Sequence, residues 1–114
     1  MIVSTAPFIA GHRVAETKGQ AFGLVVRSRG LTGNIVAGLR SLAGGEIHEY
    51  TQLLEDTRRQ ALDRLVNNAT LMGANAVISM RFDSSEMASY MTEIVAYGTA
   101  VVVEPDASAP QAME

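Results

Sequence analysis

The sequence predicts a single α+β domain in which a mostly antiparallel sheet carries two helices on one face. Two observations support this class. Strand-like segments lie near both ends of the chain, and a long amphipathic stretch at 46–72 fills the middle and stops directly before another strand-like segment. Helices that lie between terminal strands pack together on one side of the resulting sheet. The chain has 114 residues, the length of one domain, and we assign that domain to residues 1–104.

The first part of the chain contains three extended segments. Residues 1–5 form a short apolar strand, and residues 12–17 are extended before a turn at 18–20. The segment 21–27 is apolar at nearly every position, so we expect a strand that is buried on both faces. Gly23 within it indicates either a bulge or a close contact with another part of the backbone.

Two helices are expected in the middle of the chain. Apolar residues have helical spacing over Ile35–Leu42, and Gly44 and Gly45 end that helix. A longer helix covers Glu46–Met72, where apolar residues recur every three or four positions. At a rise of about 1.5 Å per residue it is ~40 Å long, whereas a compact domain of this size has a radius of gyration of about 13 Å. This mismatch predicts an elongated subunit that needs partners.

Two strands follow the long helix. Gly73 ends the helix, and residues 76–82 form a largely apolar strand. Asp83–Ser89 is expected to be a polar loop, and Met91–Val103 to be the last strand. Residues 105–114 contain two prolines and few apolar anchors, which predicts a disordered tail.

Composition excludes several classes of protein. The net charge is -3, from 9 basic and 12 acidic residues, and the basic residues do not cluster, so we expect no nucleic-acid partner. No run approaches the roughly 18 apolar residues of a membrane span, and the start lacks the features of a signal peptide. We therefore expect a cytoplasmic protein without a membrane partner. The absence of cysteine excludes disulfides and thiolate metal sites.

The aromatic content is low, with three Phe, three Tyr and no Trp. Aromatic side chains usually supply much of the buried apolar area of a core. The core must therefore be aliphatic and rich in Met, or be completed by another subunit.

One candidate metal site lies at the start of the long helix. Two carboxylates and an imidazole, from Glu46, His48 and Glu49, can ligate a divalent cation. His48 and Glu49 are adjacent, so their side chains diverge on a helix. A convergent site needs Glu46 as well, or ligands from a second subunit. The alternative is an acidic helix start with a solvated histidine.

A candidate ligand site lies around the break between the two helices, where Arg40, Glu46, Tyr50 and Arg58 can form a polar cluster. Arg40 can hold an anionic ligand as a bidentate donor. The alternative is an ion pair within or between subunits. An enzyme whose active site lies between subunits remains a further alternative for this cluster.

Catalytic signatures are otherwise missing from the sequence. There is no HExxH motif, no Ser/His/Asp order and no phosphate-binding loop. Asp83 and Glu86 lie near each other in the predicted polar loop, where carboxylates are usually solvated and catalytically idle. We therefore expect a protein that is not an enzyme, with no catalytic residues and no cofactor other than a possible divalent metal.

Residues 2–104 resemble the YbjQ-like family, a group of small bacterial and archaeal proteins. The matching blocks are Val36-Ala37-Gly38-Leu39-Arg40, Gly44-Gly45-Glu46, Tyr50-Thr51, Leu53-Leu54, Arg58 with Ala61, Gly73-Ala74-Asn75-Ala76-Val77, Arg81-Phe82-Asp83 and Ala96-Tyr97-Gly98-Thr99-Ala100-Val101. The resemblance implies a dodecin-like subunit and a ring-shaped homopentamer. It brings a heavy-metal-binding label but no established activity. We expect the helices of 35–72 and the terminal strands to form subunit interfaces, with a small ligand or ion bound between subunits.

Overall fold

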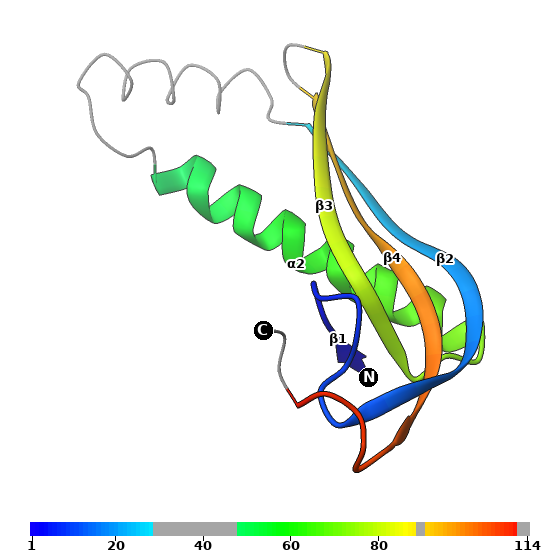
Figure 1. The fold of residues 1–114 in the computed structure, drawn as a ribbon. Coiled ribbons are helices and arrows are strands. Elements are labelled where there is room, and N and C mark those ends of the chain that lie inside the picture. Colours follow the sequence, from blue (N-terminus) through cyan, green and yellow to red (C-terminus); the bar gives the residue numbers. More distant parts are fainter. Residues whose placement is uncertain (29–47, 89–90, 112–114) are drawn as a thin grey trace.

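The computed structural model describes residues 1–28, 48–88 and 91–111; at 48–50 and 87–88 it describes the backbone alone. One sheet contains the strands β1 (Ile2–Val3), β2 (His12–Ser28), β3 (Ala76–Ala88) and β4 (Met91–Pro105), in the order β1-β3-β4-β2. The helix α2 (His48–Leu71) crosses one face of this sheet (Figure 1). The α+β class is therefore confirmed.

The pairing of the strands makes the sheet mixed. β4 is antiparallel to both of its neighbours, whereas β1 is parallel to β3. The second predicted helix, at 35–42, lies outside the described residues.

The molecule is elongated. Its radius of gyration is 17.8 Å and its extents are 55 × 30 × 16 Å, whereas a compact domain of this length has a radius of gyration of about 13 Å. The predicted elongation is thus confirmed, and the need for partners stays a prediction.

β2 is one continuous strand, so the turn predicted at 18–20 is wrong. Its register against β4 shifts between Thr17 and Gly19, and Gly19 has a φ of 121°. Glycine adopts positive φ readily, so the chain forms a bulge that bends the strand without reversing it. The segments 12–17 and 21–27 are two parts of the same strand.

The polar loop predicted at Asp83–Ser89 is also wrong, because β3 continues to Ala88. Asp83 pairs with Val95, and Glu86 pairs with Thr92. Polar residues are poor strand formers in isolation, but strand propensity depends strongly on context. Here β4 supplies backbone partners while the polar side chains remain exposed. The predicted last strand is confirmed and extends two residues further, to Pro105.

The end of the long helix is confirmed at Gly73, which has a φ of 86°. The Gly73 amide donates to the Thr70 carbonyl at 3.0 Å, and the Ala74 amide donates to the Ala69 carbonyl at 3.1 Å. These two bonds form a Schellman cap, which satisfies carbonyls that the helix leaves unpaired. The chain then enters β3 directly, as predicted.

The core lies between α2 and the sheet, and Gly23 determines how close they come. A Cβ atom at Gly23 would lie 2.0 Å from the Ala61 carbonyl oxygen and 2.4 Å from the Leu65 nitrogen. The helix backbone therefore rests directly on β2, and Ala61, Leu65 and Ala69 are fully buried. Of the two interpretations of Gly23, the close backbone contact is confirmed, because the register of β2 is continuous there.

Two side chains of α2 cover the outer edge of β2. Arg64 Nη1 donates to the Leu24 carbonyl, and Asn68 Nδ2 donates to the Phe22 carbonyl, both at 2.6 Å. A strand at the edge of a sheet otherwise offers such carbonyls to other chains. This part of the edge is therefore occupied by the helix.

The described part of the C-terminal segment is hydrogen-bonded, which differs from the disorder predicted for 105–114. The Asp106 amide donates to the Gly11 carbonyl, and the Gly11 amide donates to the Pro110 carbonyl, both at 2.9 Å. Residues 106–109 form a turn closed by the bond from the Ala109 amide to the Asp106 carbonyl. Residues 112–114 lie outside the described residues.

Replacing Gly23 by alanine tests the contact between α2 and β2. The added methyl group would overlap helix backbone, which cannot move as a flexible side chain does. We expect Gly23→Ala to lower the free energy of unfolding by about 2 kcal/mol, within the ~1–3 kcal/mol typical of overpacking. Urea denaturation at a fixed protein concentration measures it. Unchanged stability would mean that the helix does not rest on β2 at this point.

The C-terminal turn gives a pH-dependent prediction. The Ser108 hydroxyl and amide donate to Asp106 Oδ1 at 2.7 and 2.9 Å, and these bonds, with a smaller contribution from Arg13, hold the pKa of Asp106 below its ordinary value. Because the folded pKa is the lower one, the stabilisation exists above the unfolded pKa and is lost as the pH falls through the folded pKa.

We expect Ser108→Ala to raise the pKa of Asp106 towards its ordinary value, because the variant removes the larger cause. The measurement is an NMR titration of the carboxyl carbon. Arg13→Gln is the comparison and should give a smaller upward shift. Equal pKa values in wild type and Ser108→Ala would contradict this account of the turn.

Candidate functional site

The face of the sheet opposite α2, here called the open sheet face, carries unexpected apolar side chains. Successive side chains of a strand point to opposite faces, and Gly23 faces the helix. Phe22, Leu24 and Val26 therefore point away from the helix and are 49, 45 and 44% exposed. The prediction that 21–27 is buried on both faces is wrong for this chain alone, since no second layer covers this side within the described ranges.

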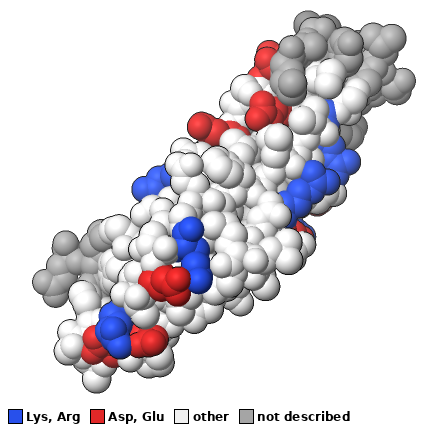
Figure 2. All heavy atoms as spheres, turned by 90° about the vertical axis from the view of Figure 1, so that its right-hand side faces the viewer, with Lys and Arg blue, Asp and Glu red and all other residues white. Residues whose placement is uncertain are grey.

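Residues of β4 extend this apolar surface. Phe22 pairs with Tyr97 and Leu24 with Val95, and directly paired residues share one face. We call Phe22, Leu24, Val26, Val95 and Tyr97 the apolar band. Figure 2 shows the side of the molecule opposite the helix, where charged side chains gather towards the ends and margins and a wide uncharged area lies between them.

A pocket of about 170 Å³ opens on this face next to the apolar band. It is lined by Gln20, Phe22, Ser79, Tyr97, Gly98 and Thr99. Gln20 and Thr99 are paired across β2 and β4, so the pocket lies between two successive cross-strand pairs. β3 contributes Ser79 from its other side.

Ser79 reaches the pocket through a bulge in β3. The register against β4 shifts between Ile78 and Arg81, and Ser79 has a φ of 54°, in the left-handed region. Gly98 is opposite the bulge, and a Cβ atom there would lie 2.6 Å from Val77 Cγ1. Glycine at position 98 therefore lets the bulge press against β4.

The N-terminal segment holds this bulge in place. The Ser79 amide donates to the Ala6 carbonyl at 2.9 Å, and the Met80 amide donates to the Ser4 carbonyl at 3.0 Å. Arg81 Nη1 donates to the Thr5 and Met80 carbonyls at 2.7 and 2.8 Å. A strained backbone persists only where surrounding contacts determine it, and these four bonds are such contacts.

The structure separates the carboxylates of the predicted hairpin tip. Asp83 and Glu86 are three residues apart in a strand, so their side chains point to opposite faces and do not form a pair. On the open sheet face, Ser85 Oγ donates to Glu93 Oε2 at 3.2 Å. A second, shallow pocket of about 360 Å³ is lined there by Asp83, Ser84, Ser85, Glu93 and Val95.

Only Arg58 of the predicted ligand cluster has a described side chain. It is exposed, and its guanidinium carbon lies 5.3 Å from the centre of the Phe82 ring. It also lines a groove of about 270 Å³ between α2 and the β3–β4 hairpin, with Thr51, Leu54, Glu55, Ser84 and Ile94. Tyr50 is in the first turn of α2, its side chain not described, and Arg40 and Glu46 lie outside the described residues. The cluster therefore stays a prediction.

The predicted metal site, like the ligand cluster, lies largely outside what the structure describes. His48 and Glu49 begin α2, but the structure does not describe their side chains, and Glu46 lies outside the described residues. Among the residues that are described, no three His, Asp or Glu side chains are grouped so that they could hold a metal ion. Likewise, none of the described helix is long and apolar enough to cross a membrane.

Together these features define a thin α+β fold with one helix-covered face and one open sheet face. The chain belongs to the YbjQ-like family: the family model, described as "Putative heavy-metal-binding", matches residues 1–104. This confirms the resemblance found in the sequence, and the family description itself names no activity for this chain.

Curated relatives cover nearly the whole chain. It is 64% identical over 105 residues to a UPF0145 protein of Bradyrhizobium sp. (strain ORS 278), covering 92% of this chain and 95% of the relative. It is 62% identical over 109 residues to a UPF0145 protein of Methanoregula boonei, covering 96% and 91%. These relatives carry the name of an uncharacterised family.

A solved structure supports the fold. A DUF74 family protein of unknown function from Pediococcus pentosaceus is similar with a TM-score of 0.63 and 14% sequence identity, covering 91% of this chain and 98% of that one. At this identity the likeness concerns the fold alone.

The pocket at Gly98 was not found from the sequence. Tyr97, Gly98 and Thr99 drew notice only as part of a family block, and nothing in the local sequence indicates that Ser79 adopts a left-handed conformation. The signal that was available is the run of apolar residues at 21–27, which indicated a covered second face without saying what covers it.

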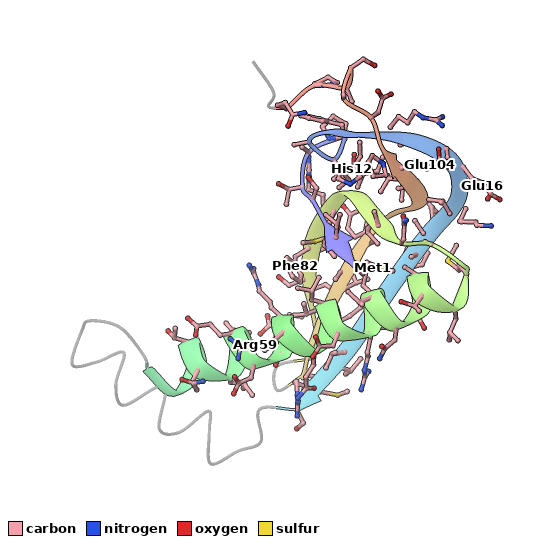
Figure 3. The ribbon with its side chains drawn as sticks, turned by 90° about the horizontal axis from the view of Figure 1, so that it is seen from below. Met1, His12, Glu16, Arg59, Phe82 and Glu104 are labelled. Atoms are coloured by element: carbon pink, nitrogen blue, oxygen red, sulfur yellow. The ribbon has the colours of Figure 1, made fainter. Side chains whose placement is uncertain are left out.

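Arg58 and its neighbour Arg59 offer a matched test of the contact with Phe82, which lies beside α2 in Figure 3. We expect Arg58→Ala to lower the free energy of unfolding by about 0.5–1 kcal/mol, the range for an exposed cation–π contact. Arg59→Ala, also on the exposed side of α2, should change it little. Equal losses from the two variants in urea denaturation would exclude a specific role for the ring contact.

Proposed function

We propose that this chain is a non-enzymatic subunit of a homo-oligomer whose neighbours cover the open sheet face. The resemblance to the YbjQ-like family supports a ring of five subunits. A small ligand or ion binds between subunits in this proposal, and the protein acts by binding it. The observation that carries the proposal is the apolar band on the open sheet face.

The apolar band differs from the pattern expected for a sheet that has one solvent-exposed face. Such antiparallel strands alternate apolar residues towards the core with polar residues towards water. β2 instead places Phe22, Leu24 and Val26 outward, each exposed by nearly half. Contiguous exposed apolar patches of this kind are typical of sites where proteins associate.

Several observations favour a second copy of the chain as the occupant. The subunit is only 16 Å thick and 17.8 Å in radius of gyration, so its own core is thin. The contact uses the face of the sheet, because Arg64 and Asn68 already occupy the β2 edge. In a closed ring each subunit presents two different surfaces to its neighbours. The open sheet face would be one of these surfaces.

The binding role follows from the chemistry of this face. Its pocket is lined by hydroxyl and amide groups and by aromatic rings, which are suited to holding a molecule. Catalysis by a hydroxyl nucleophile needs a base within hydrogen-bond reach, and the described lining of this pocket contains no histidine. Binding is therefore the simpler use of these groups.

Leu24→Glu tests the assembly. A carboxylate at the centre of an apolar contact would lose its hydration without a partner, which costs several kcal/mol. We expect the wild-type protein to run as an oligomer in gel filtration with light scattering. We expect Leu24→Glu to run mainly as the 12.1 kDa subunit at the same concentration.

Leu71→Glu is the matched control, because Leu71 is 86% exposed at the end of α2, away from the open sheet face. It should leave the assembly intact. A wild-type monomer at micromolar concentration would refute the oligomer. An oligomer that resists Leu24→Glu but not Leu71→Glu would show that a different surface forms the contact.

A further inference from the structure

The pocket at Gly98 combines polar groups that the fold itself does not use. Gln20, Ser79, Tyr97 and Thr99 bring one amide and three hydroxyls to its lining, from three strands. Within the described ranges, none of these four side chains makes a hydrogen bond to another residue. Their capacity to donate and accept is therefore available to a bound molecule.

Ser79 occupies a position that suits glycine better. Its φ of 54° is in the left-handed region, where glycine carries no penalty and other residues do. The bonds that the Ser79 and Met80 amides donate to the Ala6 and Ser4 carbonyls involve backbone atoms alone, so they hold this conformation whatever the side chain is. Ser79 belongs to the pocket lining, and its side chain brings a hydroxyl that glycine lacks.

The described lining also favours uncharged ligands. Among the residues that the structure describes, no Asp, Glu, Lys or Arg belongs to it. The nearest paired cation, Arg81 opposite Tyr97, directs Nη1 to the Thr5 and Met80 carbonyls. A cation would find no carboxylate among the described lining residues, and an anion no positive charge that is free of other partners. The described lining therefore favours a neutral ligand.

The lining groups define the ligand further. Hydroxyls and a carboxamide both donate and accept, so they match ligand hydroxyls, which do the same. The rings of Phe22 and Tyr97 are neighbours across β2 and β4 and offer apolar surface to C–H groups. The volume of about 170 Å³ is below the ~300 Å³ at which pockets for drug-sized ligands begin.

We infer that this pocket binds a small uncharged cyclic polyol of monosaccharide or inositol size. Its ring hydroxyls would meet Gln20, Ser79, Tyr97 and Thr99, and its C–H face would meet Phe22. The inference rests on the proposed function, because a neighbour that covers the open sheet face would enclose the pocket. It specifies the chemical class of the ligand that is bound between subunits.

Amide NMR on the deuterated full-length protein tests this inference, with myo-inositol and D-glucose as the probes. We expect saturable shifts at the Ser79, Gly98 and Thr99 amides for at least one probe. Cyclohexanol, which has the ring but a single hydroxyl, should bind at least about tenfold more weakly, because most of the hydrogen bonds are lost.

Two variants separate binding from folding. Ser79→Gly should keep or raise the melting temperature, because it relieves the left-handed strain, yet lower the affinity for the probe about fivefold, the effect of one lost hydrogen bond. Tyr97→Phe keeps the ring and should weaken binding similarly. Ser85→Ala, on the same strand but outside the pocket lining, should leave the affinity unchanged.

The inference is overturned if no saturable shift occurs up to about 50 mM of either polyol, well above the ~1 mM of weak specific binding. It is also overturned if Ser79→Gly and Tyr97→Phe bind as the wild type does. Light scattering on the same samples keeps the two proposals apart. An oligomer without shifts refutes the polyol and leaves the assembly standing, whereas a monomer with variant-sensitive shifts refutes the assembly and supports the pocket.

Discussion

The direct contact between the backbone of α2 and Gly23 is the constraint on which the other features depend. Because no side chain separates helix from strand there, small residues lie beside the contact, with Ala61 and Ala69 fully buried, while larger side chains such as Leu65 and Ile94 fill the core around it. The same closeness brings Arg64 and Asn68 within hydrogen-bond reach of the β2 edge. One glycine therefore accounts for the close approach of helix and sheet and for the coverage of part of the β2 edge.

β2 carries its larger apolar side chains on the face of the sheet opposite the helix. Phe22, Leu24 and Val26 alternate along β2 with Ala21, Gly23 and Val25, which face the helix, and therefore point to the other side of the sheet. The covered face and the open sheet face are thus two results of one packing solution. This explains why a chain with an ordinary apolar content, 47%, has a thin core of its own and yet exposes an apolar band.

Sequence reasoning succeeded where the signal is local. The helix ending at Gly73 and the strand from Met91 were predicted because capping and strand patterns act over a few residues. It failed at Gly19 and at Asp83–Ala88, where pairing with β4, distant from Gly19 in the sequence, decides the outcome. For the candidate sites, sequence spacing identified Arg58 but not its contact with Phe82. It missed Ser79 entirely. The left-handed conformation of Ser79 is held by residues 4–6 and leaves no signal in the neighbouring sequence. The predictions for Arg40, Glu46, His48, Glu49 and Tyr50 concern side chains that the structure does not describe.

The bonds between Ser4–Ala6 and the β3 bulge also bear on how the protein is made. The two partners are more than 70 residues apart, and Thr99 joins the same pocket from still further along the chain. Contacts of such long range are slow to form, because bringing their two partners together costs the conformational entropy of closing a long loop. On the ribosome the amino-terminal residues emerge first, but their partners in β3 and β4 are synthesised later. The pocket is consequently one of the last parts of the molecule to be completed, and a chain that stops short of β4 cannot build it.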